Sequence, residues 1–348
     1  MRPQNESILQ SYNKILLFFR KQPRYISWLI KGGSLVLFAL LIWYQIFNRN
    51  NFETIKITFL SELKGKHIAW LLLTFLFLPF NWASETLKWL HLIRHNEDIS
   101  FWHAYKAVLA GVTFSLFTPN RIGEFGGRIL FLKSENALKG VFSTIVGSWA
   151  QQIMLVSFGY LGFIYFLFAL WHIEKFILLG ILLLALLLLS SMFFIFLNLE
   201  IVVPLFKKIR FLYHFPSLIK SINIIRQYTK AELSRTLFWA FIRYSIYCLQ
   251  YYFMLRFFGI NVPIGAGVSC IATIYLVQTS IPLPPIFGLA ARGEIALQIW
   301  GLFGANPVSI LAATFTLWII NLIIPALIGL IYILKANLLK SLGYEKIS

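Results

Sequence analysis

Charged residues and helix breakers stand together in the stretch FTPNRIGEFGGR, residues 117–128, with apolar segments on both sides. Arginine carries a permanent charge and a planar fork of donors that fits phosphate oxygens. A partly desolvated glutamate would either pair with an arginine or titrate. The stretch therefore predicts an anion-binding turn. Its candidate binding residues are Arg121, Glu124 and Arg128, and its candidate structural residues are Pro119, Gly123, Gly126 and Gly127.

A second stretch repeats the order serine, proline, arginine, glycine–glutamate about half a chain later, from Ser280 to Glu294. Two related motifs favour an inverted repeat, in which broken helices from opposite membrane faces meet near the midplane around a substrate. Ion pairs that only pin the two segments in place are the alternative interpretation. The candidate binding residues of the second stretch are Arg292 and Glu294, and its candidate structural residues are Pro284, Pro285, Gly288 and Gly293.

The composition places both motifs in a membrane. Of the 348 residues, 59% are hydrophobic and 13% are charged, too few charges to cover a soluble domain of this size. A helix needs about 20 apolar residues to cross about 30 Å of hydrocarbon. We predict an all-α polytopic membrane protein with about six full transmembrane helices plus two re-entrant helical hairpins. The six apolar stretches are residues 30–47, 68–83, 141–170, 176–197, 236–258 and 308–334.

The distribution of basic residues predicts the orientation. The net charge of +18 is concentrated in loops beside apolar stretches, so we expect the positive-inside rule to apply and no nucleic acid to bind. Six crossings place three basic segments on the cytoplasmic side of the cell membrane. These segments are the N-terminal residues 1–28, a linker at 199–235 and a tail at 336–348.

Two further apolar stretches, residues 104–132 and 263–303, contain the motifs and do not fit the count of crossings. A single crossing by either would put basic segments on opposite sides. We therefore predict that each is a re-entrant hairpin, the first opening to the cytoplasm and the second to the outside, with protein or water satisfying its backbone amides. The transmembrane domain is then residues 29–335, with repeat halves at roughly 29–170 and 176–335.

Three polar residues inside apolar stretches have two open interpretations each. Arg243 would face a central cavity and pair with Glu294 or an anionic headgroup, or it would extend to the cytoplasmic interface. Gln151 and Gln152 would line a polar path, or they would form hydrogen bonds between helices.

Residues His91 and His95 share one helical face, with Glu85, Lys88 and His103 nearby. The acidic residue of an HExxH motif is missing between them, so we predict an interfacial polar helix rather than a metal site. The chain also has no GxSxG motif, P-loop or Asp-rich metal motif. We therefore predict no catalytic residue, cofactor or metal, and a protein that is not an enzyme.

The stretch TPNRIGEFGGR resembles the Pro-Gly-Arg-x-Gly-Glu-x-x-Arg motif of the lysylphosphatidylglycerol synthase transmembrane family, the flippase-like region of multiple-peptide-resistance proteins. The stretch IPLPPIFGLAARGEIALQIWGLFG is similar to that family's second Pro/Gly-rich motif. In the first motif, Asn120 replaces the usual glycine. Relatives often carry a Glu-Arg pair in the following helix, where this chain has Gln151 and Gln152, which implies a substrate other than lysylphosphatidylglycerol.

The resemblance implies a flippase-like transporter of an anionic phospholipid or a lipid-linked polyprenyl or glycosyl precursor. The chain is expected to lack the soluble aminoacyltransferase domain of some relatives and to act beside a separate glycosyltransferase or lipid-modifying enzyme. Two alternatives remain open. One is a membrane-embedded transferase that uses Glu124 or Glu294 as a base, and the other is a scaffold or accessory subunit for a glycosyl- or aminoacyl-transferase.

Overall fold

The computed structural model describes residues 32–33, 36, 52–63, 65–170, 173–208, 221–281 and 288–336. These residues form helices and connecting turns, without a strand among them. The predicted span at 30–47 and the tail at 336–348 lie almost wholly outside the described residues. The predicted class, an all-helical membrane protein, is confirmed for the rest of the chain.

Four long helices have the length and apolar character to cross a membrane. They are α4 (Ile68–Ile93), α7 (Ala137–Leu170), α8 (Lys175–Leu197) and a composite helix of α14 (Pro307–Trp318), a π-helical segment (Ile319–Ile323) and α15 (Ile324–Lys335). Helix α11 (Lys230–Phe257) has a similar length and a more polar sequence, and it begins with a capping box between Thr229 and Glu232.

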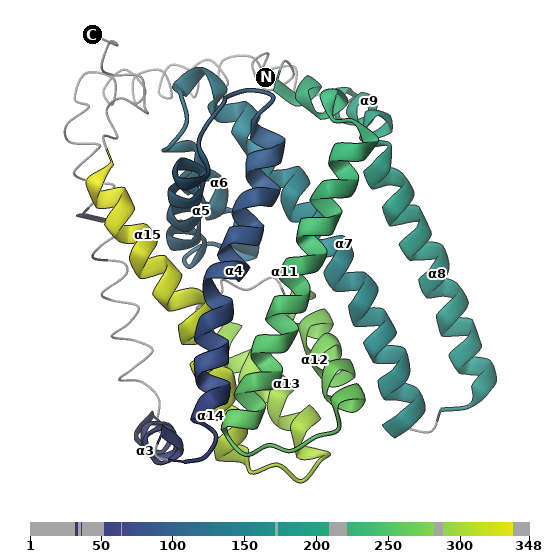
Figure 1. Cartoon of the computed structure of the whole chain (residues 1–348). Coiled ribbons are helices and arrows are strands. Elements are labelled where there is room, and N and C mark those ends of the chain that lie inside the picture. The colour runs from purple at the N-terminus through teal and green to yellow at the C-terminus, as the bar shows by residue number, and fades with distance from the viewer. Residues whose placement is uncertain are drawn as a thin grey trace, which may run out of the picture.

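Four shorter helices form two pairs. The first pair is α5 (Phe101–Ser115) and α6 (Gly123–Ile129), which are joined through a 3₁₀ turn at Pro119–Arg121. The second pair is α12 (Ile264–Thr279) and α13 (Gly288–Gly301). At about 1.5 Å per residue, none of the four reaches across 30 Å of hydrocarbon. The pairs enter the bundle from opposite ends, and both turn back near its middle (Figure 1).

The remaining helices lie at the two ends of the bundle (Figure 1). Helix α3 (Phe52–Leu63) precedes α4 at one end. The other end carries α9 (Val202–Lys207) and short 3₁₀ segments at Ser134–Asn136, Leu199–Ile201 and Asn223–Gln227. Both halves of the chain thus follow one order: a long helix, two short helices and another long helix.

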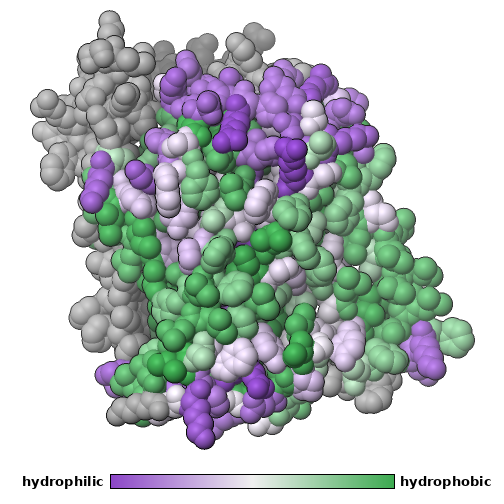
Figure 2. Space-filling model, in the orientation of Figure 1, coloured by the Kyte–Doolittle hydropathy of each residue, from purple (hydrophilic) through white to green (hydrophobic). Residues whose placement is uncertain are grey.

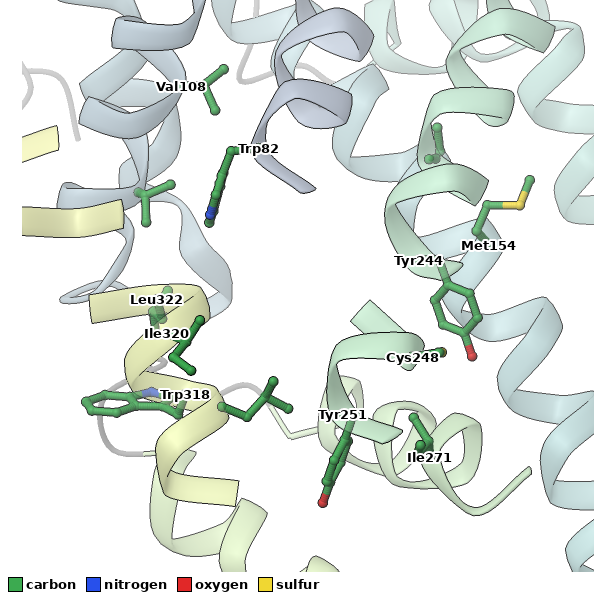
Figure 3. Packing of buried hydrophobic residues seen from close by; sticks show 14 of the residues in the cluster. Trp82, Val108, Met154, Tyr244, Cys248, Tyr251, Ile271, Trp318, Ile320 and Leu322 are labelled. Carbon is green, nitrogen blue, oxygen red and sulfur yellow. The ribbon is translucent and has the colours of Figure 1, made fainter. Parts of the chain in front are cut away.

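Helices α4 and α11 pack against each other in the centre of the bundle. Helix α7 packs on α12, and α15 packs on α5, so each short pair is held by a long helix from the opposite half. The buried apolar side chains between them include Trp82 of α4, Val108 of α5, Tyr251 of α11 and Trp318 of α14 (Figure 3). The core therefore joins the two halves rather than filling each one separately.

On the face shown in Figure 2, hydrophobic residues form a belt across the middle of the bundle, and hydrophilic residues gather at its two ends. Helix α8 contributes much of the belt, since most of its apolar side chains are exposed, including Phe176 and Leu187. In water such a surface would aggregate, whereas in lipid it is the expected outer face.

One predicted span ended too early in the sequence. The span predicted at 68–83 continues as α4 to Ile93, and it buries Glu85 and Lys88 instead of leaving them in an interfacial polar helix. The span had been ended at Ala83 because charged residues follow. Partners on other helices make their burial tolerable, and the sequence alone does not show those partners.

Candidate functional site: a buried network of charges between the hairpins

Glu85 lies at the centre of a network of charged side chains inside the bundle. Its carboxylate accepts from Lys88 Nζ at 2.6 Å, from Arg128 Nη2 at 2.7 Å and from Arg243 Nη1 at 2.5 Å. Three different helices, α4, α6 and α11, supply these four side chains, and at most 5% of each is exposed. One carboxylate thus balances part of the charge of three cations.

Arg128 connects this centre to the first motif. Its Nη2 also lies 3.2 Å from Glu124 Oε2, one helical turn earlier in α6. Its guanidinium carbon lies 5.5 Å from the centre of the Trp89 ring, a cation–π distance. The Nε atom is buried and has no hydrogen-bond partner among the described residues. Arg128 is therefore fixed through Nη2, and its Nε remains an unused donor.

Two glycines allow α6 to pack directly against α5. A Cβ atom at Gly127 would lie 2.5 Å from both the Ala110 carbonyl oxygen and the Gly111 Cα atom. A Cβ atom at Gly123 would lie 2.2 Å from the Phe114 carbonyl oxygen, whereas one at Gly126 would meet nothing within 4 Å. Gly123 and Gly127 therefore form a G-x-x-x-G face that permits close helix contact. Helix α6 begins at Gly123, so both glycines of this face lie within it.

The turn between α5 and α6 has an unusual backbone. Asn120 and Arg121 have φ angles of 50° and 59°, in the left-handed region that residues with a side chain seldom adopt. Asparagine tolerates this region better than most residues do. The motif that this stretch resembles has a glycine at the same position, and glycine adopts this backbone without strain. Arg121 forms an ion pair with Glu124, and 35% of its side chain remains exposed. Its Nε has no hydrogen-bond partner in the described part of the chain.

Arg243 is held from the other side by a chain of amide groups. Its Nε donates to Asn81 Oδ1 at 3.1 Å, and its Nη2 donates to Tyr247 OH at 3.2 Å. The Asn81 amide donates in turn to Gln250 and to Asn321, each at 3.2 Å. Asn321 belongs to the π-helical segment, a local irregularity that is often found at functional sites. The predicted pair of Arg243 with Glu294 does not form, because Glu85 takes that place.

The second hairpin contributes less to the network. Arg292 of α13 is partly buried and lies within electrostatic reach of Arg121, Tyr247, Tyr251 and Tyr275. No ion pair or hydrogen bond joins Arg292 to another described residue. Glu294 is exposed, and its one hydrogen bond among the described residues comes from Gln298 at 3.2 Å.

The structural residues of the second motif are only partly described. Gly288 begins α13, and a Cβ atom at Gly293 would lie 3.1 Å from the end of the Leu311 side chain. Pro284 and Pro285 lie outside the described residues. The close glycine seating of the first hairpin therefore has no counterpart at Gly293, where a flexible side chain is the neighbour.

The two adjacent glutamines of α7 form hydrogen bonds between helices. Gln151 accepts from Lys88 Nζ at 3.3 Å and donates to the Ala240 carbonyl oxygen at 3.3 Å. Gln152 accepts from Thr279 Oγ1 at 3.1 Å, near the tip of the second hairpin. The bond between Gln151 and Lys88 attaches α7 to the charged network.

The structure thus brings Arg121, Glu124, Arg128 and Arg243 together, and it leaves Arg292 and Glu294 outside the ion pairs of the described residues. Sequence reasoning missed Glu85 and Lys88 as members of the site. A usable signal was present: two opposite charges three residues apart, between Trp82 and Trp89 in an otherwise apolar helix.

Positive charge is in excess in this group. Five cationic side chains, Lys88, Arg121, Arg128, Arg243 and Arg292, stand against two carboxylates, Glu85 and Glu124, among the described residues. An uncompensated charge inside a membrane protein is costly. An arrangement of this kind attracts anions, and phosphate oxygens are well suited to its arginine forks.

A family model described as "Lysylphosphatidylglycerol synthase TM region" matches residues 32–329. No curated protein sequence and no solved structure matches the chain significantly. The matched residues include every charged side chain of the network and both motif segments.

Proposed function

The chain belongs to the lysylphosphatidylglycerol synthase transmembrane family, and from this premise we propose that it carries an anionic lipid headgroup across the membrane. The substrate is a phospholipid or a lipid-linked polyprenyl or glycosyl precursor. Its phosphate binds the arginines at the hairpin tips while its tails stay in lipid. The observation that supports this most is the excess of arginine and lysine over glutamate in the middle of the bundle.

The arrangement of the helices supports a transport mechanism. The order of long, short, short and long helices occurs in both halves, and the short pairs enter from opposite ends (Figure 1). This is the pattern of an inverted repeat with two re-entrant hairpins around a midplane site, and rocking of one half against the other would expose the site to each side in turn. Transport is facilitated or secondary, since the sequence has no nucleotide-binding motif.

The proposed orientation puts the opening of the first hairpin on the cytoplasmic side of the cell membrane. Basic residues outnumber acidic ones at the end that carries α9 and the start of α11, with Arg94, Lys133, Lys139, Lys208 and Arg226 among them. The positive-inside rule assigns such an end to the cytoplasm. A separate lipid-modifying enzyme or glycosyltransferase would then supply or use the carried lipid.

The test is scrambling of fluorescent phosphatidylglycerol by purified protein in liposomes that contain phosphatidylglycerol. We expect the Arg128→Ala and Arg121→Ala variants to fall at least about tenfold toward the protein-free rate. Arg121→Ala loses a charge-assisted phosphate contact, and Arg128→Ala loses the ion pairs with Glu85 and Glu124 that hold the site together. Arg256→Ala is the matched control, because that arginine lies over the Trp70 ring at the far end of α11, 5.8 Å from its centre. Size exclusion and thermal unfolding confirm that each variant is folded.

Unchanged scrambling by well-folded Arg121→Ala and Arg128→Ala proteins would overturn the proposal. A folded wild-type protein that scrambles no anionic lipid would also overturn it. Co-purification of an enzyme would then favour the accessory role, and product formation by the purified chain would favour a membrane-embedded transferase.

A further inference from the structure

We propose that the site selects a diphosphate-bearing headgroup over a single phosphodiester and over an aminoacylated, cationic headgroup. This inference rests on the proposed function and names its substrate class. It follows from which arginines are already bound to carboxylates, which are accessible, and how much charge is left unbalanced.

The cations of the site fall into two groups. Lys88, Arg128 and Arg243 are sealed, with at most 5% of each side chain exposed, and all three contact Glu85. Arg121 and Arg292 are the accessible pair, since both are only partly buried. The sealed group is the support of the site, and the accessible pair is available to a ligand.

The accessible arginines come from opposite hairpins: Arg121 lies in the Pro119–Arg121 turn and Arg292 near the start of α13, and both hairpins turn back near the middle of the bundle (Figure 1). Arg292 has no acidic partner among the described residues, and Arg121 shares Glu124 with Arg128. Two like charges held in proximity favour a ligand that offers negative charge to both at once. Two adjoining phosphates do this, each accepting from one guanidinium fork.

The charge balance gives the same result. With all groups ionised, the five cations exceed the two carboxylates by three charges. A phosphodiester supplies about one negative charge, a phosphate monoester about 1.5–2, and a terminal diphosphate more than either, so the diphosphate neutralises the site most completely. An aminoacyl lipid with free ammonium groups adds positive charge to a site that already has too much.

Glu124 has a particular place in this scheme. It lies between Arg121 and Arg128, where its carboxylate stands in for an anion in the absence of ligand. A diphosphate would release Arg121 from Glu124, while Arg128 would remain attached to Glu85. The Glu124→Gln variant should therefore bind anions more tightly, because the internal competitor is gone.

The experiment measures binding to the full-length protein in nanodiscs, with farnesyl diphosphate, farnesyl monophosphate, cardiolipin and lysylphosphatidylglycerol as separate probes. We expect farnesyl diphosphate to bind at least about tenfold more tightly than the monophosphate, because one more charge-assisted contact is made. Cardiolipin, whose two phosphates are separated, tests whether adjoining phosphates are needed. Arg121→Gln and Arg292→Gln should each remove most of the preference, whereas Arg256→Gln should keep it.

Equal binding of the mono- and diphosphate would overturn the inference, as would tightest binding of lysylphosphatidylglycerol. A preference for cardiolipin over farnesyl diphosphate would overturn it too, because it would mean that the arginines bind separated phosphates. Should the preference be absent while phosphatidylglycerol scrambling still depends on Arg128, the transport proposal would stand and only the substrate class would be wrong.

Discussion

The two hairpins carry related motifs but occupy different surroundings. In the first, Glu124 and Arg128 are buried and connected to Glu85, and Gly127 brings α6 against α5. In the second, Arg292 has no ion pair in the described part of the chain, and Glu294 faces outward. The same order of residue types therefore makes a fixed element in one half and a loosely held one in the other.

The difference comes from the long helices rather than from the motifs. Glu85 of α4 and Arg243 of α11 both lie on the side of the first hairpin, where the carboxylate binds Arg128 and Arg243 together. Among the described residues, no carboxylate forms an ion pair with Arg292, and the nearby Glu294 accepts a hydrogen bond from Gln298 instead. Under the transport mechanism proposed above, we expect the loosely held second hairpin to move more than the first.

The largest effect should come from replacing Glu85 with Gln. The change leaves Lys88 and Arg243 without a carboxylate, and breaking a buried ion pair in this way costs about 3–5 kcal/mol. Glu294→Gln removes the carboxylate of the second hairpin, but its exposed site should keep the change in stability within about 0.5 kcal/mol. Thermal unfolding in detergent, followed by tryptophan fluorescence, measures both.

A second substitution separates charge from packing in the Glu85 variant. Adding Lys88→Met to Glu85→Gln removes one of the unpaired cations, so part of the lost stability should return. Equal unfolding temperatures for Glu85→Gln and Glu294→Gln would contradict the proposed difference between the hairpins.

The next effect concerns glycine packing. Gly127→Ala places a methyl group 2.5 Å from backbone atoms of α5 and should cost about 1–3 kcal/mol or more. Gly126→Ala, in the same helix with open space around it, should be neutral or stabilising by up to about 1 kcal/mol. Gly293→Ala meets only the end of the Leu311 side chain, 3.1 Å away, and should fall between them. The unfolding temperatures of the three variants test this order. An unfolding temperature of Gly127→Ala equal to that of Gly126→Ala would contradict it.

The smallest effect concerns the turn of the first hairpin. Asn120→Gly should change stability by less than about 0.5 kcal/mol, because both residues accept the left-handed backbone at φ 50°. Asn120→Val should cost about 1–2 kcal/mol, since a β-branched side chain is strained there. A valine variant as stable as the glycine variant would mean that the turn adopts another backbone in solution.

The coarse architecture was predictable from the sequence because it depends on local patterns. Long apolar stretches set α7, α8 and the composite helix from Pro307 to Lys335, to within a few residues. Pro119 and Gly123 mark the break between α5 and α6. The positions of Arg121, Glu124 and Arg128 were predictable as an anion-binding group because charges are rare in such surroundings.

What the sequence determined by itself is the membrane class, the long helices and the two motif segments, because periodicity, composition and spacing are local properties. Only the tertiary structure decided that Glu85 is the partner of Arg128 and Arg243, residues 43 and 158 positions away along the chain. It also decided that Lys88 is buried and that Glu294 is not. Long-range packing chooses which charges meet, because a carboxylate can stay buried only where helices from distant parts of the chain bring cations to it.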